Sequence, residues 1–384
     1  MVKRTQKLSQ NNSLFVFGAR GVGKTTLIRD LFAGPQTLWI DLLSQEDEEN
    51  YRKSPSTLSH ELNKSSYKTV VIDEVQKVPK LLDIVHMEIE RQKGIQFVMS
   101  GSSARKLKRG AANLLAGRAF TYHLYPLTCF ELGSAFELNQ VLQFGSLPSL
   151  FEYESLDDIR QYLRSYVRTY LREEIQIEQI VRNVEPFRSF LEVAAQVSGK
   201  IINYSKISDD LGVDDKTVKA YFQILEDTLI GFRLPAFHRS VRKRQRSQSK
   251  FFLFDLGVKR ALQNLLTVPV EPQTFEYGSA FEHFLILESH RLNEYHQKDF
   301  NLSYLRTKDD AEIDLVIERP GQKDLLVENK SYTRINPKHV NPLKKFKDDW
   351  DREAEAQIWS NDPRPKVIND VQCLPWQEAL QAFI

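Results

Sequence analysis

Short apolar runs separated by longer polar and amphipathic stretches dominate the first third of the chain. Strand-like runs stand at residues 13–17, 37–42, 68–74, 95–102 and 120–124, and a helical pattern follows the first of them over residues 26–32. Short runs that are apolar throughout are typical of parallel strands that are buried on both faces. The pattern therefore predicts an α/β domain built on a parallel sheet.

The rest of the chain changes its pattern twice. Residues 201–221 have the rhythm of a helix, a glycine-containing turn and a second helix, and residues 225–234 read as wing-like strands, as in a winged helix. Residues 300–307, 312–317 and 324–330 read as three strands in a meander, because short turn-forming stretches separate them.

Residues 18–25 match the phosphate-binding pattern G-x-x-x-x-G-K-[ST], the Walker A motif, with a strand before it and a helix after it. Glycines are needed because a turn that wraps its N–H groups around a phosphate leaves no room for a Cβ atom. We expect Lys24 to reach the β- and γ-phosphates of ATP or GTP, and the Thr25 hydroxyl to be one ligand of Mg²⁺. A glycine-rich turn without a ligand is the alternative. The candidate nucleotide-binding residues of this loop are Gly18, Ala19, Arg20, Gly21, Val22, Gly23, Lys24, Thr25 and Thr26.

Two carboxylates end the strand-like run at 68–74. Beside a P-loop, Asp73 is placed to hold Mg²⁺ directly or through water, and Glu74 to polarise the attacking water as a general base. Carboxylates after a strand also cap helices, but the P-loop ahead of these two favours a Walker B motif.

One strand-like run, at 37–42, lies between the two motifs, as in the additional-strand order of AAA-type ATPases. The polar tip at 100–103 then stands where such enzymes sense the γ-phosphate, so that Ser100 and Ser102 are candidate nucleotide contacts. Arg118 precedes the last strand-like run of this part and can act as an arginine finger on the nucleotide of a neighbouring subunit. An ordinary surface arginine is the alternative.

Several motifs of this chain are shared with one family. They are the stretches at 73–79 (DEVQKVP), 100–103 (SGSS), 116–119 (AGRA), 125–128 (YPLT), 145–148 (GSLP), 252–257 (FLFDLG) and 278–282 (GSAFE). With these motifs the sequence resembles, nearly end to end, the prokaryotic AAA-type ATPases fused to a C-terminal domain of formerly unknown function. The resemblance implies that the C-terminal part has an α/β restriction-endonuclease-like fold, related to the PD-(D/E)XK nucleases.

The residue pattern of these nucleases is matched in this chain. Asp314, followed one strand later by Glu328 and Lys330, matches Asp and Glu-x-Lys, although Asn329 stands where the pattern usually has an apolar residue. Alternation along a strand puts Glu328 and Lys330 on one face, and a neighbouring strand can bring Asp314 beside them. Glu282, in the helical segment before the meander, matches the helix carboxylate that often completes such a site.

Carboxylates in this arrangement can hold one or two Mg²⁺ or Mn²⁺ ions, and a lysine ammonium can orient hydroxide or balance phosphate charge. The candidate metal ligands are therefore Glu282, Asp314 and Glu328, and the candidate catalytic residues are Asp314, Glu328 and Lys330. Two alternatives stay open: a surface ion-pair cluster, and a nuclease-like domain that serves only for docking.

Asp214 and Asp215 stand at the start of the second helix of the winged-helix-like segment. They argue against ordinary docking into the major groove, although acids also cap helices. The expected nucleic-acid contact is instead a basic arm at residues 238–250. Its cations, with no acid between them, are Arg239, Arg242, Lys243, Arg244, Arg246 and Lys250. A solvated loop is the alternative.

The amino-acid composition restricts which partners and which cell compartment we expect for this protein. Lys plus Arg number 53 and Asp plus Glu 51, so attraction to nucleic acid must come from local patches rather than from net charge. Only two cysteines are present, which argues against a disulfide framework and a Cys-based zinc site. Because no cleavable signal and no apolar run of spanning length stands in the sequence, we expect a cytoplasmic protein without membrane contact.

The sequence predicts three domains: a P-loop AAA-type ATPase core at 1–150, a helical lid and winged helix with the basic arm at 151–250, and a nuclease-like domain at 251–384. The leading hypothesis is an ATP-hydrolysing, self-associating protein that couples its nucleotide cycle to binding of nucleic acid, expected to be DNA, and to metal-dependent phosphodiester cleavage. The first alternative is a nucleotide-dependent switch whose C-terminal fold binds DNA or a protein without cutting. The second is an ATPase that acts on protein partners.

Overall fold

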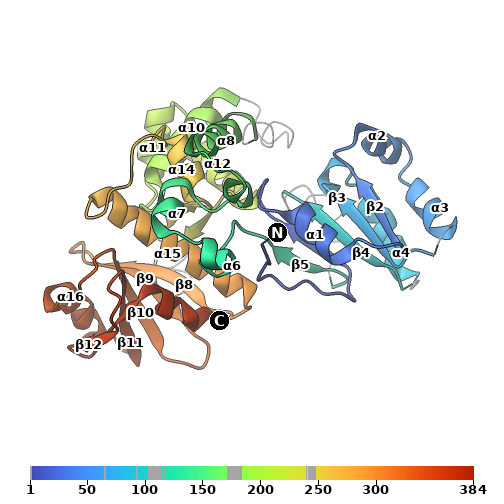
Figure 1. Cartoon of the computed structure of the whole chain (residues 1–384). Coiled ribbons are helices and arrows are strands. Elements are labelled where there is room, and N and C mark those ends of the chain that lie inside the picture. The colour runs from blue at the N-terminus through green and yellow to red at the C-terminus, as the bar shows by residue number, and fades with distance from the viewer. Residues whose placement is uncertain are drawn as a thin grey trace. The chain divides into compact units, whose positions relative to one another are not determined.

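The computed structural model describes residues 2–64, 66–91, 94–102, 115, 117–170, 184–238, 240 and 248–384. The chain divides into two compact units (Figure 1). Unit 1 comprises Met1–Leu127, Leu147–Ser149 and Gln223–Ile230, and unit 2 comprises Thr128–Ser146, Leu150–Phe222 and Gly231–Ile384.

The structure does not describe some of the candidate residues that were named from the sequence. The residues in question are Ser103 of the polar tip and the arm cations Arg239, Arg242, Lys243, Arg244 and Arg246, all of which lie outside the described residues. Within the described part of the chain, no helix is both long and apolar enough to cross a membrane.

The described strands of unit 1 form one five-stranded parallel sheet in the order β2-β3-β4-β1-β5. They are β1 (Leu14–Phe17), β2 (Thr37–Asp41), β3 (Thr69–Asp73), β4 (Gln96–Gly101) and β5 (Phe120–His123). In β3, Val70, Val71 and Ile72 are all fully buried, which is why this run lacks the alternation of a half-exposed strand. The prediction of a parallel sheet is confirmed, and β4 lies between β1 and β3.

Helices cover this sheet and complete its core. They are α1 (Lys24–Phe32), α2 (Gln45–Lys53), α3 (Thr57–Lys64) and α4 (Leu81–Glu90), with a short turn η1 (Val75–Lys77) after β3. Leu58 of α3 and Leu81 of α4 belong to the same buried core as Ile72 and Phe97 of the sheet. Because all the strands are parallel, their carboxyl ends meet at one edge of the sheet, where ligands of open α/β sheets bind.

Unit 2 begins with helices and ends with a mixed sheet. Its helices are α6 (Cys129–Leu132), α7 (Leu138–Phe144), α8 (Leu156–Ser165), α10 (Val184–Val197), α11 (Tyr204–Leu211), α12 (Asp215–Asp227, whose last residues are grouped with unit 1), α14 (Leu256–Leu262), α15 (Phe275–Tyr295), α16 (Pro337–Asp348) and α17 (Trp376–Ala379). Strands β6 (Gly231–Leu234) and β7 (Lys250–Leu253) form an antiparallel pair.

The helix–turn–helix predicted for residues 201–221 is present as α11 and α12. Both acids at its second helix have internal partners, since Asp214 accepts the Thr217 N–H at 2.6 Å and Asp215 accepts the Ser208 hydroxyl at 2.8 Å. The wing prediction for 225–234 was partly wrong. Helix α12 extends to Asp227, so the first residues of this stretch are helical. The strand in this stretch is β6, and it pairs with β7, which comes from later in the chain.

The C-terminal sheet has six described strands in the order β12-β13-β11-β10-β9-β8. They are β8 (Asn301–Arg306), β9 (Glu312–Glu318), β10 (Asp324–Lys330), β11 (Ala354–Ser360), β12 (Lys366–Ile368) and β13 (Val371–Pro375). Strands β8, β9 and β10 are antiparallel neighbours, in agreement with the predicted meander, whereas β11 runs parallel to β10 after the crossover through α16. Val340 and Leu343 of α16 pack in one core with Leu326 and Ile358 of the sheet.

A buried polar hub, formed by Asp255, Glu288 and Arg291, fixes α15 in unit 2. Arg291 donates to the Phe254 carbonyl at 2.7 Å and to Glu288 at 3.1 Å. Asp255 caps α14 by accepting the Val258 N–H at 3.0 Å, and it accepts the Ser146 N–H at 2.7 Å. Burial raises the pKa of both carboxyl groups, while Arg291 acts in the opposite direction.

The hub explains why the short motifs at 145–148 and 252–257 belong together. Gly145 has a φ of 78°, and a Cβ atom there would lie 2.1 Å from the Asp255 carboxylate. Any side chain at this position would therefore displace the carboxylate that caps α14. Gly145, Ser146 and Asp255 of these motifs thus contribute to the packing of unit 2.

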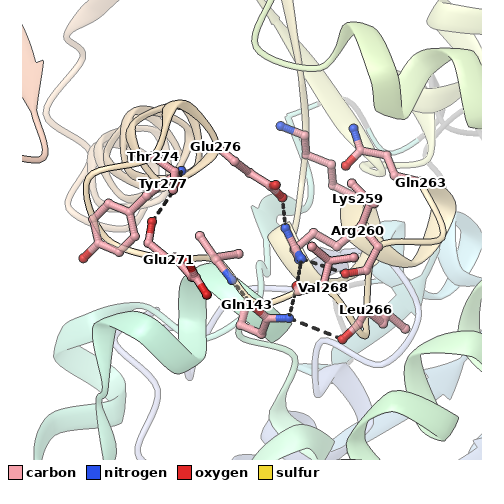
Figure 2. Close-up of polar contacts among 12 residues, drawn as sticks. Gln143, Lys259, Arg260, Gln263, Leu266, Val268, Glu271, Thr274, Glu276 and Tyr277 are labelled. Atoms are coloured by element: carbon pink, nitrogen blue, oxygen red, sulfur yellow. Dashed lines mark hydrogen bonds and ion pairs between the residues drawn. The ribbon is translucent and has the colours of Figure 1, made fainter.

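The loop that joins α14 to α15 is tied down by side chains from α7 and α14 (Figure 2). Gln143 donates to the Val268 carbonyl at 2.9 Å and accepts the Val270 N–H at 2.7 Å. Arg260 donates to the Leu265 carbonyl at 2.7 Å and pairs with Glu276 at the start of α15. These contacts place the first turn of α15 and hence the helix that carries Glu282.

We predict that Asp255→Ala destabilises unit 2 by about 2–4 kcal/mol, because two buried N–H groups lose their acceptor. The matched control is Ser155→Ala. Ser155 caps α8 through the Asp157 N–H at 3.1 Å on the protein surface, and its loss is expected to cost about 1 kcal/mol. The shift in the urea unfolding midpoint, followed by circular dichroism, measures both. An Asp255→Ala shift no larger than that of Ser155→Ala would contradict the role of the hub.

Candidate functional site

The P-loop leaves β1 at Gly18 and enters α1 at Lys24. The ammonium of Lys24 is buried, and it donates to the carbonyls of Gly18 at 2.9 Å and Ala19 at 3.2 Å. A Cβ atom at Gly18 would lie 2.4 Å from the Leu124 carbonyl, so the loop can pass beside the end of β5 only with glycine at this position. The loop thus holds its cation on its own carbonyl groups, in the concavity where the motif predicts phosphates.

Asp73 joins the P-loop helix to the tip of β4. Its carboxylate accepts the Thr25 hydroxyl at 2.7 Å and also the Ser100 hydroxyl, and its side chain is 1% exposed. Thr25 and Asp73, the two predicted Mg²⁺ ligands, are therefore direct neighbours. Hydroxyl and carboxylate oxygens are the donors that Mg²⁺ uses in proteins, so these residues fit the ion.

Glu74 follows Asp73 with a left-handed backbone, at φ 58° and ψ 47°. One of its carboxylate oxygens lies 4.0 Å from the Lys24 ammonium, and its N–H donates to Ser100 Oγ at 3.2 Å. The predicted base thus stands beside the predicted phosphate-binding cation, at the carboxyl edge of the sheet.

Gln76 is a functional candidate that the sequence reasoning missed. Its amide donates to the Glu74 carboxylate and to Ser102 Oγ, the latter at 3.1 Å. Its side chain is buried, although an amide has no apolar group that packing would favour. No signal in the sequence marked Gln76, because Lys77 and Lys80 in the same stretch are polar as well and the sequence does not show which of the three side chains is buried.

Arg4 is a second residue that the sequence reasoning missed. Its guanidinium donates to the Val22 carbonyl of the P-loop at 2.8 Å and to the Tyr125 carbonyl at 2.6 Å. It therefore links the loop to the segment after β5. No sequence motif marked it, because the contact to Tyr125 spans 121 positions.

Arg118 stands just before β5 and pairs with Glu90 of α4. Its side chain is 40% exposed. Of the other loop candidates, Arg20 is half-buried and Thr26 is exposed. The described contacts thus bring Lys24, Thr25, Asp73, Glu74, Ser100 and Ser102 together through direct or shared hydrogen bonds and ion pairs, while Arg118 pairs with an acid of α4.

Three carboxylates converge in unit 2. One oxygen each of Glu282 on α15 and of Glu312 and Asp314 on β9 lie within 4.8 Å of one another. Glu312 and Asp314 share a face of β9 because they are two residues apart. We call these three residues the carboxylate cluster. Glu312 was missed from sequence, although its place two positions before Asp314 in a predicted strand was a usable signal.

Lys250, the first residue of β7, contacts this cluster. Its ammonium lies 3.0 Å from a Glu282 oxygen and pairs with Glu312 as well, and only 4% of the residue is exposed. The prediction that Lys250 belongs to the basic arm was therefore wrong. Its side chain is enclosed by the carboxylate cluster, so it is not available to a nucleic-acid backbone.

Glu328 and Lys330 form a pair next to the cluster. The Lys330 ammonium donates to Glu328 at 2.6 Å, and both side chains belong to β10. Asp314 accepts the Asn329 N–H at 2.7 Å, which fixes it beside β10. The predicted proximity of Asp314 to β10 is thus present, but Glu328 is not among the three residues whose oxygens converge.

Burial and the charges of neighbouring groups both shift the pKa values of Asp314, Glu328 and Lys250. Burial raises the pKa of Asp314 well above its usual value, and the Glu328 and Glu282 carboxylates raise it further. Burial also raises the pKa of Glu328, with Lys330 acting in the opposite direction. Burial lowers the pKa of Lys250, but the carboxylates of Glu282, Asp314 and Glu312 outweigh burial and the net shift is upward.

Three family models match successive parts of the chain. Residues 10–133 match a model described as AAA domain, residues 135–268 a domain of unknown function (DUF8612), and residues 277–378 a domain of unknown function (DUF4143).

Three bacterial proteins align with half of the chain or more. An uncharacterized protein of Mycobacterium tuberculosis is 25% identical over 306 residues, which make up 79% of this chain and 67% of the relative, and one of Mycobacterium bovis gives the same values. An uncharacterized protein of Haemophilus influenzae is 22% identical over 211 residues, which make up 50% of this chain and 51% of the relative.

Among solved structures, the replication initiator DnaA bound to AMPPCP and single-stranded DNA covers 57% of this chain and 83% of its own. The identity is 15% and the TM-score 0.30, a likeness too distant to inform fold or ligand. The match of residues 10–133, together with the parallel sheet and its P-loop, identifies this segment. Residues 10–133 are an AAA-family ATPase domain, and residues 277–378 are a DUF4143 domain.

Proposed function

We propose that this protein hydrolyses ATP in its AAA domain, and that its C-terminal part binds nucleic acid, with DNA as the favoured class, and cleaves it with a divalent metal ion. The observation that carries the first part is the set of contacts that joins Lys24 to Glu74 and Thr25 to Asp73. Hydrolysis of a nucleotide needs a cation for the phosphates, donors for Mg²⁺ and a base for water, and these residues provide all three.

The residues of the P-loop site divide this work. Lys24 leaves the carbonyls of its own loop to bind the β- and γ-phosphates, and Thr25 and Asp73 hold Mg²⁺, which neutralises phosphate charge. Glu74 takes the proton of the attacking water. Gln76 positions Glu74 by its amide N–H, and Ser100 orients Asp73 from the opposite side.

Lys24→Ala is expected to abolish ATP binding, because the phosphates lose their main cation. Glu74→Gln should leave binding intact and lower kcat by roughly a hundredfold or more, because only the base is lost. Calorimetry with a non-hydrolysable ATP analogue and a phosphate-release assay measure the two effects. Hydrolysis by Glu74→Gln at the wild-type rate would contradict the assignment of the base.

Gln76→Ala serves as the positioning variant within the same experiment. Since it frees Glu74 without removing it, we expect kcat to fall about tenfold with an unchanged Kd for the nucleotide. Asp30→Ala, an exposed change on α1 at a residue outside the P-loop, is the matched control and should leave both values near those of the wild type.

Self-association is part of the proposal through Arg118. Because its side chain is partly exposed at the start of β5, it can reach the nucleotide of a second subunit once released from Glu90. We predict that Arg118→Ala and Glu74→Gln proteins, each deficient alone, regain part of the ATPase activity when mixed, since one subunit supplies the base and another the arginine. A protein that stays monomeric with ATP and Mg²⁺ and yet hydrolyses normally would show Arg118 to be a surface residue.

The C-terminal part of the proposal rests on topology and donor chemistry. Helix α15 comes before the antiparallel strands β8, β9 and β10, which agrees with the helical segment and three-strand meander expected from the sequence, and β11 follows parallel to β10 after α16. The carboxylate cluster has the oxygen donors that Mg²⁺ and Mn²⁺ take, so its residues fit such an ion. Lys330 balances phosphate charge or orients the water, and Glu328 sets the position of Lys330.

A second function, docking of DNA or of a protein without cleavage, is favoured by one observation. Lys250 and Lys330 already pair with carboxylates of this site. Internal pairing of this kind lets a nuclease-like domain keep its fold without a metal ion.

Cleavage separates the two functions. Asp314→Ala and Glu328→Ala are each expected to remove Mn²⁺-dependent cleavage of DNA while sparing ATP hydrolysis, because the two sites belong to different units. Glu312→Gln should reduce cleavage at least about tenfold, whereas Glu318→Gln at the end of the same strand should not. The assay uses single- and double-stranded DNA and RNA with Mg²⁺ or Mn²⁺. Absence of cleavage of every substrate by the wild type would leave docking as the function.

A further inference from the structure

Lys250 is anchored at its main chain and directs its side chain at the carboxylate cluster. Its backbone pairs with Leu234 in β6 and forms a bridge to Ile201. The preceding residue, Ser249, accepts the Ile202 N–H at 3.0 Å. Because the main chain is held by these contacts, only the side chain has freedom to move away from the cluster.

The ammonium of Lys250 bridges α15 and β9. It binds Glu282 of α15 at 3.0 Å and Glu312 of β9, and it also lies 5.4 Å from the centre of the Tyr304 ring. Glu282, Glu312 and Asp314 are part-buried, and their carboxylate oxygens lie within 4.8 Å of one another, so they repel one another and a cation beside them reduces this repulsion.

Within the described part of the chain, Lys250 is the lysine whose ammonium pairs directly with both Glu282 and Glu312. Lys330, the other lysine of the site, donates to Glu328. With all four carboxylates ionised, Glu282, Glu312, Asp314 and Glu328 and the ammonium groups of Lys250 and Lys330 carry a net charge of −2 (four negative, two positive), and the net charge is −1 while Asp314, whose pKa is raised, is protonated. The site therefore still attracts a divalent ion while Lys250 is present.

A divalent ion and the ammonium compete for the same oxygens. Mg²⁺ and Mn²⁺ bind oxygen ligands at roughly 2.0–2.3 Å, closer than the ammonium. An ion that takes oxygens of Glu282 and Glu312 at this distance would stand within a few ångströms of the Lys250 ammonium, where the two positive charges repel. The side chain of Lys250 must then turn away.

We propose that Lys250 is the internal counter-ion of the carboxylate cluster, and that a divalent ion binds the cluster only by displacing the Lys250 ammonium. This inference rests on the metal site of the proposed function and adds a residue that sets its affinity. Lys250 is a positioning residue, because it acts on the metal ligands and not on the substrate.

The direct test is Mn²⁺ calorimetry on the full chain without nucleotide. The signal that Asp314→Ala removes is assigned to the cluster, which separates it from binding at Thr25 and Asp73. We expect Lys250→Met to bind Mn²⁺ in this component at least tenfold more tightly than the wild type, because no displacement is needed. Lys323→Met, which removes an exposed lysine of the same unit, is the matched control and should leave the affinity unchanged.

A second measurement uses the wild type, so it does not depend on the folding of a variant. Lysines are acetylated with limiting acetic anhydride, with and without Mn²⁺, and the modification of Lys250 is compared by mass spectrometry with that of Lys323. Displacement should raise the relative modification of Lys250 at least threefold in Mn²⁺. If Lys250→Met does not fold, the variant Lys250→Met/Glu312→Gln, which removes one charge of each sign, replaces it.

The outcomes separate the inference from the function on which it rests. A wild type that binds Mn²⁺ through Asp314, with an affinity unchanged in Lys250→Met and with no change in Lys250 acetylation, overturns the inference and keeps the metal site. Absence of Asp314-dependent binding in both the wild type and Lys250→Met overturns both. Tighter binding by Lys250→Met without cleavage of any nucleic acid supports the inference and removes only the nuclease activity.

Discussion

Buried charge has to be compensated inside the protein, and this constraint determines how the important side chains of both units are arranged. In unit 1 the Lys24 ammonium rests on carbonyl groups of its own loop, and Asp73 accepts hydroxyl groups from two other segments. In unit 2, one buried hub orders α15, and a lysine from β7 holds the carboxylate cluster. Each arrangement joins segments that are distant in sequence, so the same contacts that satisfy the charges also define the tertiary structure.

The charges of Lys24 and Lys250 are compensated by different kinds of partner. The partners of Lys24 are main-chain carbonyls, which a nucleotide phosphate can replace with little change in the surrounding fold. The partners of Lys250 are carboxylates, whose own repulsion depends on the lysine that separates them. The first cation thus lies on neutral acceptors and the second between ions of opposite charge, so only the second lowers the net charge of the groups around it.

Sequence reasoning succeeded where the determining contacts are local. The P-loop, the strand that ends in Asp73 and the strand tip with Ser100 follow from motif spacing and from apolar runs, and parallel strands necessarily bring their carboxyl ends to one edge. Gln76 escaped because the pattern of residues does not show which polar side chain turns inward. The contacts of Arg4 with the P-loop and with Tyr125 could not be predicted from the sequence, because 121 positions separate Arg4 from Tyr125.

The carboxylate cluster of the C-terminal part shows more clearly what cannot be predicted from the sequence. The meander could be predicted from alternating strands and turns, and it correctly placed Asp314 beside β10. The composition of the cluster depends on where β7 and α15 pack against β9, which no local pattern encodes. Lys250 was therefore assigned to a run of cations by its neighbours in sequence, whereas its neighbours in space are acids.

The left-handed backbone of Glu74 determines which substitutions at this position would stabilise the protein. A residue other than glycine in the left-handed region costs about 1 kcal/mol or more, and asparagine or glycine would occupy the position with less strain. Laboratory selection for thermal tolerance alone would therefore favour loss of this carboxylate, although the fold around it would remain. A library screened only for heat resistance is thus biased toward well-folded proteins that lack this carboxylate, and a screen that is meant to keep Glu74 needs a second criterion at every round.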